Sequence, residues 1–125
     1  MAVLTPILVV DEIEPCIPFW TERLGFQKTT EVPHEGELGF VILERSGVEV
    51  MYQSKASLSI DLPQLAGRGE RAVLYMQVEN LEELEAKMAG VEPAIPMRQT
   101  SYGAAEIGFA DPAGNVVVFS MHSGY

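Results

Sequence analysis

Apolar and polar positions follow two different periods along the chain, and their order predicts the secondary structure of the first half. Residues 3–10 form a run of mostly apolar, β-branched side chains, which predicts a strand buried on both faces. In residues 15–24 apolar side chains recur every three or four positions, which predicts a helix that Gly25 ends. Residues 26–32, 38–44 and 48–53 then predict three short strands, the last two joined as a hairpin.

The second half of the chain shows the same succession of patterns. Residues 72–79 predict a strand, and Asn80 is the expected N-cap of a helix over residues 81–89. Residues 93–98 contain two prolines, which favours a short strand at the edge of a sheet. Residues 102–120 predict a closing hairpin, because apolar flanks surround a turn-forming centre of Asp, Pro, Gly and Asn.

Strand, helix and three strands therefore occur twice, and one register relates both halves. We predict an α+β fold in which two tandem βαβββ modules, at about residues 1–54 and 72–125, form curved mixed sheets around a cleft within one domain. Residues 55–71 have no clear period and are expected to connect the modules, with one helical turn near residues 62–66.

Composition restricts the classes of partner. The chain has 125 residues, 47% of them hydrophobic, and a formal net charge of −10, which argues against nucleic-acid partners and against anionic membranes. No apolar run approaches the length of a membrane span, so we expect a soluble, cytoplasmic protein. Cys16 is the only cysteine, and we expect it to be a small packed residue rather than a nucleophile.

Several motifs resemble the vicinal oxygen chelate superfamily, which includes glyoxalase I, extradiol dioxygenases, fosfomycin-resistance enzymes and bleomycin-resistance proteins. They are residues 19–26 (FWTERLGF), residues 111–115 (DPAGN) and the doubled βαβββ order, and the resemblance covers the whole chain. The bleomycin-resistance branch is the most similar, because Tyr102, Glu106 and Phe119 also match its C-terminal part.

The resemblance implies where a metal would lie if the chain were an enzyme of this superfamily. Those enzymes hold one divalent metal with His and Glu at matching positions of the two halves. The matching positions here are Thr5, Met51, Val73 and Val118, none of which is a His or a carboxylate. We therefore expect no metal and no cofactor. His34 and His122 lie outside these positions and are expected to be solvated surface residues.

Strand alternation predicts which side chains line the cleft. The concave positions are Thr5, Met51, Gln53, Val73, Tyr75, Glu106, Val118 and Ser120, and Tyr102 is expected at the mouth. From these, the predicted ligand-binding residues are Met51, Gln53, Tyr75, Tyr102, Glu106 and Val118. Met51 can adapt its shape to a ligand, and the tyrosines can stack on a ring or a cation. Glu106 either pairs with a ligand cation or bonds to a neighbouring strand.

The sequence thus favours a metal-free small-molecule-binding protein of the bleomycin-resistance type. It would sequester an amphipathic or cationic aromatic ligand, with no catalytic residues. The resemblance implies a homodimer, with exchange of residues 1–10 about Pro6 as one way to form it. The alternative is a glyoxalase-like or dioxygenase-like lyase or isomerase with a non-standard or metal-free active site, using Glu106 or Glu49 as a base. A regulatory or structural module has no sequence feature in its favour.

Overall fold

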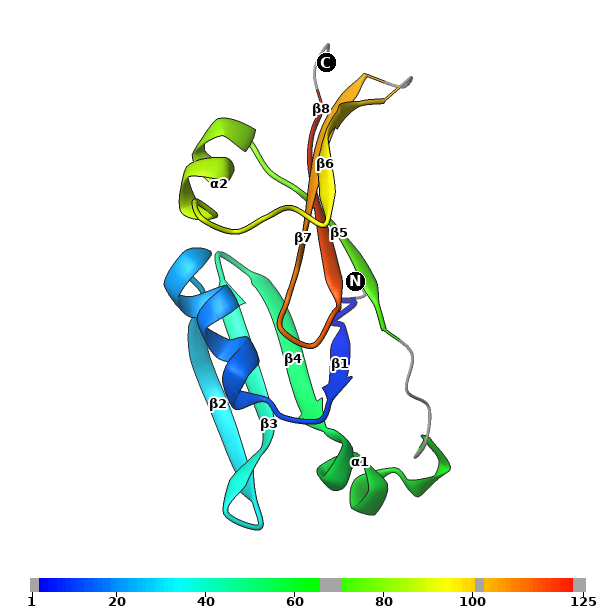
Figure 1. The fold of residues 1–125 in the computed structure, drawn as a ribbon. Helices are drawn as coiled ribbons and strands as arrows, with labels where there is room; N and C mark the ends of the chain where they lie inside the picture. The colour runs from blue at the N-terminus through cyan, green and yellow to red at the C-terminus, as the bar shows by residue number, and fades with distance from the viewer. Residues whose placement is uncertain (1–2, 66–70, 101–102, 123–125) are drawn as a thin grey trace. The chain divides into compact units, whose positions relative to one another are not determined.

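The structure, a computed structural model, describes residues 3–65, 71–100 and 103–122 (Figure 1). The chain divides into two compact units, Met1–Glu70 and Arg71–Tyr125, and each is described by itself. Every unit contains one four-stranded mixed sheet. The succession of strand, helical segment and three strands occurs once in each unit, which confirms the predicted α+β fold of tandem βαβββ modules.

The first unit carries its sheet in the order β1-β4-β3-β2, with β1 parallel to β4 and the other pairs antiparallel. Its elements are β1 (Ile7–Val10), η1 (Glu14–Cys16), η2 (Phe19–Arg23), β2 (Gln27–His34), β3 (Glu37–Arg45), β4 (Val48–Ser54), α1 (Lys55–Asp61) and η3 (Pro63–Leu65). The first strand is shorter than predicted, and β2 extends two residues beyond its predicted end to His34.

The second unit repeats this arrangement in the order β5-β8-β7-β6, with β5 parallel to β8. Its elements are β5 (Val73–Gln77), α2 (Leu81–Lys87), β6 (Ile95–Gln99), β7 (Ala104–Ala110) and β8 (Val116–His122). The predicted N-cap is confirmed, because the Asn80 side chain accepts a hydrogen bond from the backbone N–H of Glu83 at 3.1 Å.

A single α-helix over residues 15–24 is wrong as a description of the first helical segment. The chain instead forms a 3₁₀ turn, η1, and a π-helical turn, η2. Pro15 and Pro18 lack the backbone N–H that a regular α-helix requires, which explains the irregular start. Glu14 fastens this segment to the sheet, because its Oε2 accepts a hydrogen bond from the Leu38 backbone N–H at 2.9 Å.

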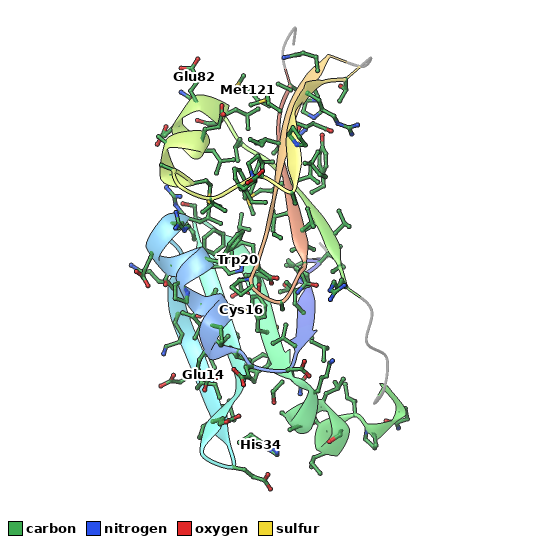
Figure 2. The ribbon with its side chains drawn as sticks, in the orientation of Figure 1. Glu14, Cys16, Trp20, His34, Glu82 and Met121 are labelled. Carbon is green, nitrogen blue, oxygen red and sulfur yellow. The ribbon has the colours of Figure 1, made fainter. Side chains whose placement is uncertain are left out.

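The apolar side of this helical segment packs against one face of the first sheet. Trp20 and Cys16 are each about 1% exposed, and both are labelled in Figure 2. The Trp20 indole Nε1–H donates a hydrogen bond to the Tyr52 hydroxyl at 2.8 Å. The rings of Phe19 and Phe26 contact Trp20 edge-on, with centroids 5.5 and 4.9 Å away. Cys16 is therefore a packed core residue, as expected.

Residues that were predicted to be mainly a connector contain a helix. The side chain of Ser54 caps α1 by accepting a hydrogen bond from the Ser57 backbone N–H at 3.1 Å. Leu58 is the buried residue of α1, whereas Ile60 is 75% exposed. One buried position in seven residues gives no apolar period, and this is why the pattern did not predict the helix.

One outer edge of each sheet is irregular. The strand β2 is exposed along almost its whole length, and its register with β3 shifts at two places. The strand β6 is exposed beyond Ile95, and its register with β7 shifts between Ile95 and Arg98. The opposite edges, β1 and β5, pair in regular parallel register with β4 and β8.

Candidate functional site

Four residues of the second sheet lie directly opposite one another across all four strands. Gln77 of β5 pairs with Ser120 of β8, Ser120 with Glu106 of β7, and Glu106 with Arg98 of β6. We call these four residues the polar row. Because residues that are paired across strands project from the same side of a sheet, the polar row marks one face, which we call the second face.

Tyr75 joins the polar row from β5. Its hydroxyl donates to the Ser120 Oγ at 2.6 Å and also lies 3.1 Å from the His122 Nε2. The Tyr75 and His122 rings meet edge-on with centroids 6.4 Å apart. A phenol has one hydrogen, so when Tyr75 donates it to Ser120 the imidazole Nε2 must carry a hydrogen and donate. Two partners thus fix the orientation of a ring that is 52% exposed.

The other end of the polar row is an ion pair. The Nε and Nη2 of Arg98 donate to the same oxygen of Glu106, Oε1, at 3.1 and 2.8 Å. The Glu106 side chain is 2% exposed and the Arg98 side chain 61% exposed. Of the two alternatives for Glu106 given above, the structure contains the bond to a neighbouring strand.

A bulge in β6 determines which residue meets Glu106. Ile95 pairs with Gly108 and Arg98 with Glu106, so three steps along β6 match two along β7. Without this extra residue Met97 would stand opposite Glu106, because side chains alternate between faces along a strand. The bulge therefore places a guanidinium, rather than a thioether, on the second face.

The corresponding row of the first sheet is mostly apolar. Val9 of β1 pairs with Gln53 of β4, Gln53 with Phe40 of β3, and Phe40 with Val32 of β2. We call these four residues the apolar row. Its one polar member, Gln53, is 6% exposed. The Gln53 Nε2 donates to the Ser57 Oγ at 3.3 Å and to the Asp61 Oδ2 at 3.4 Å, which ties β4 to α1.

The structure places the predicted binding residues in two sets. Met51 and Gln53 lie two positions apart on β4 and share one face of the first sheet. Tyr75, Glu106 and Val118 share the second face of the second sheet, with Val118 directly opposite Tyr75. Tyr102 lies outside the described residues. A role for each of them in ligand binding remains a prediction.

Two residues on the second face, His122 and Arg98, were not among the predicted site residues. His122 was expected to be solvated, yet it contacts Tyr75, 47 residues earlier in the chain. Arg98 was assigned to the end of an edge strand with no role. Strand alternation extended to the end of β8 would have placed His122 on the face of Ser120, whereas the bulge before Arg98 has no signal in a single sequence.

The family's metal positions do not fit a metal in this chain. Met51, Val73 and Val118 carry no nitrogen or oxygen in their side chains, and a lone threonine hydroxyl at Thr5 is an insufficient ligand set. Among residues 3–65, 71–100 and 103–122, no group of three or more His, Cys, Asp or Glu side chains is arranged to hold a metal ion. No helix within these ranges is both long enough and apolar enough to cross a membrane.

The doubled βαβββ modules and the paired mixed sheets define a member of a known superfamily. A family model described as the glyoxalase/bleomycin resistance protein/dioxygenase superfamily matches residues 2–119. The chain therefore belongs to this superfamily. A comparison with curated proteins found no match.

Solved structures with the same fold include TioX, a lactoylglutathione lyase and a bleomycin-binding protein. TioX from Micromonospora sp. ML1 is 17% identical, with a TM-score of 0.78 over 98% of this chain and 99% of that one. Lactoylglutathione lyase from Agrobacterium tumefaciens is 14% identical, with a TM-score of 0.78 over 96% and 92%. A bleomycin-binding protein complexed with bleomycin is 18% identical, with a TM-score of 0.71 over 98% and 100%. These likenesses show the fold that the proteins share.

Proposed function

We propose that this chain is a small-molecule-binding protein of the bleomycin-resistance type. It sequesters an amphipathic or cationic aromatic ligand without a resident metal, and no bond is made or broken. The observation that carries this proposal is the half-exposed ring of Tyr75, which Ser120 and His122 hold in place. A ring fixed before binding loses little conformational entropy when a ligand stacks on it.

The remaining predicted residues are divided between the two units. Val73 is 71% exposed on the face of Tyr75, so apolar area adjoins the ring, whereas Val118 opposite Tyr75 is 8% exposed. On the first sheet Met51 is an adaptable apolar group, and the buried Gln53 amide is bonded to α1. An apolar surface with a few polar groups suits a flat, amphipathic molecule. Tyr102 is retained as a binding residue on the sequence argument alone.

A homodimer remains part of the proposal. It is supported by the family resemblance, and exchange of the N-terminal strand is one form that it would take. Within the described chain β1 pairs with β4 of the same chain, Ile7 opposite Met51. An exchanged dimer would replace this pairing with the same pairing between two copies. Light scattering at several protein concentrations measures whether the dimer forms.

A metal-free enzyme is the alternative, and the contact between His122 and Tyr75 favours it. An imidazole and a phenol can each donate or accept a proton, so the pair has the groups that acid–base chemistry needs. Measuring the metal content of protein purified without chelator shows whether the enzyme alternative would depend on a metal. Stoichiometric zinc, iron, manganese or nickel would support a displaced metal site and contradict sequestration without metal.

The experiment that tests sequestration is a calorimetric titration of metal-free protein with a bleomycin-type glycopeptide, at low and at physiological salt. We expect about one ligand per chain, with affinity weakened about ten-fold by Tyr75→Ala and only slightly by Tyr75→Phe, which keeps the ring. Ile60→Ala removes an exposed apolar side chain from α1 and is the matched control, with unchanged affinity expected.

The negative results have different meanings. Absence of heat with the glycopeptide at both salt concentrations would exclude bleomycin as the ligand, and a thermal-shift screen of aromatic small molecules would follow. If no molecule in that screen stabilises the protein, the proposed binding function is wrong. Equal affinities for the wild type and Tyr75→Ala would show that binding occurs away from the second face.

A further inference from the structure

Arg98 is held in position by a buried carboxylate. Glu106 is 2% exposed and accepts two hydrogen bonds from the guanidinium on a single oxygen. A guanidinium has five N–H donors, and this pair uses one on Nε and one on Nη2. The Arg98 side chain is also 61% exposed. A partly exposed guanidinium that is already oriented has donors for a second acceptor, and a carboxylate matches its planar fork best.

The β6 bulge determines which side chain of the second unit meets Glu106. It turns Arg98, rather than Met97, onto the face of Tyr75 and Ser120. In the apolar row the positions of Glu106 and Arg98 are taken by Phe40 and Val32. Bulges that re-aim a side chain are over-represented next to functional sites.

A ligand cation meets an obstacle on this face. Its natural partner is Glu106, but that carboxylate is buried beneath the exposed guanidinium with which it pairs. To reach Glu106 a cation would have to displace Arg98, which breaks two charge-assisted hydrogen bonds at a buried charge. It would also approach a like charge. The second face therefore discriminates against a cation and in favour of an anion.

The ring surface and the guanidinium lie within reach of one small molecule. Tyr75 leans from the outer strand onto Ser120, and Arg98 leans from the opposite outer strand onto Glu106. Ser120 and Glu106 are directly opposite on adjacent strands, which run about 4.8 Å apart. Tyr75 and Arg98 come from strands three spacings, about 14 Å, apart and lean toward each other, so a ligand that contacts both needs an extended ring system with its carboxylate at one end.

From these observations we infer that the second face selects ring-bearing carboxylates, with the ring on Tyr75 and the carboxylate on Arg98. The inference rests on the proposed binding function and chooses between its two ligand classes, the amphipathic and the cationic. Arg98 is then a specificity-determining residue, and Glu106 is a positioning residue that acts through Arg98 rather than on the ligand.

The test compares three probes with one ring system: 2-naphthoate, 2-naphthylmethylammonium and neutral 2-naphthalenemethanol. Each is titrated calorimetrically into the full chain at about 0.15 M salt, where long-range repulsion by the acidic protein is largely screened. We expect 2-naphthoate to bind at least about ten-fold more tightly than the ammonium probe, with the alcohol between them. Arg98→Gln should abolish this preference, and Arg98→Lys should retain part of it.

Lys87→Gln is the matched control, because it removes one positive charge from α2 in the same unit, and it should leave the preference intact. Circular dichroism verifies that each variant is folded, and Arg98→Lys serves as the second variant if Arg98→Gln is not. A preference for the ammonium probe, or an unchanged preference in Arg98→Gln, would overturn the carboxylate inference and leave the binding function standing. Failure of all three probes to bind would overturn the carboxylate inference, whereas the binding function would be overturned only if the glycopeptide and the screen of aromatic molecules failed as well.

Discussion

The two sheets share one topology and one register, yet their equivalent rows differ in chemistry. Gln53 corresponds to Ser120, and Val9 to Gln77. The largest difference lies at the other two positions, where Phe40 and Val32 stand in the first sheet and the Glu106–Arg98 ion pair stands in the second.

This difference shows how a repeated fold acquires a site. The strand order is the same in both units, so different side chains at equivalent positions place an ion pair in one row only. An apolar row needs no partners, whereas a polar row must satisfy each buried group. Among the described residues, no buried side-chain nitrogen or oxygen lacks a hydrogen-bond partner. Each buried member of the polar row therefore has a hydrogen-bond partner.

The largest expected effect on stability concerns the sheet face that carries Tyr52 in the first unit and Phe119 in the second, where the units also differ. In the first unit Tyr52 accepts a hydrogen bond from Trp20, whereas the equivalent residue of the second unit, Phe119, has no hydroxyl. Trp20→Ala should lower the free energy of unfolding by about 3–5 kcal/mol, because it removes a large buried ring. Urea denaturation monitored by circular dichroism measures this change.

Tyr52→Phe separates the hydrogen bond from the packing. It keeps the ring and removes the hydroxyl that accepts from Trp20, so a loss of only about 1 kcal/mol is expected. If Tyr52→Phe were as destabilising as Trp20→Ala, the hydrogen bond rather than ring burial would dominate this layer.

A smaller effect is expected when the polar row is converted into the apolar one. Arg98→Val deprives the buried Glu106 carboxylate of its guanidinium partner and should cost about 1–2 kcal/mol, since the exposed arginine is partly screened by water. Glu106→Phe combined with Arg98→Val installs the residues of the first sheet, and should recover most or all of this loss. Thermal and urea denaturation at pH 7 measure both variants.

The double variant also tests whether the ion pair serves ligand selection or folding. Recovered stability together with loss of 2-naphthoate binding would show that the ion pair serves ligand selection rather than folding. If the double variant is less stable than Arg98→Val alone, the second sheet cannot accommodate the apolar row. The surroundings of the two rows would then differ in how side chains pack.

The smallest expected effect depends on pH and lies in the first unit. The hydrogen bond from the Leu38 backbone N–H lowers the pKa of Glu14 below its usual value of 4.5. A carboxyl whose pKa is lower when folded stabilises the protein above its unfolded pKa, and this contribution disappears as the pH falls through the folded pKa.

Glu14→Gln tests this linkage. The variant should be slightly less stable than the wild type at pH 7 and nearly equal to it at pH 3, when both are compared by urea denaturation. Because Glu14 is exposed, the difference should be small. A difference that persists unchanged at pH 3 would show that the carboxylate charge does not contribute.

The sequence was sufficient to predict the repeated order of one strand, one helical segment and three strands, because apolar periods and turn residues are local signals. It correctly placed the Asn80 cap and the hairpin that ends in β8. It also placed Tyr75, Val118 and Glu106 together on one face, because strand alternation and the repeat fix their register.

Other features depend on tertiary pairing and could not be derived in this way. The bulge before Arg98 is defined only by its partner strand β7. The contact of His122 with Tyr75 joins residues 47 positions apart, and no local pattern reports it. The ion pair of Glu106 was one of two open alternatives, since an isolated sequence does not show which cation is nearest.

The irregular outer edges have a consequence for how the protein behaves at high concentration. A bulged, exposed strand that contains proline, such as β2 with Pro33 or β6 with Pro96, is a poor template for a strand from another molecule. On that edge, each sheet therefore resists the repeated addition of strands that leads to fibrils. Any further strand would have to add at the regular edges, β1 and β5, so growth of an intermolecular sheet is limited to one direction per unit.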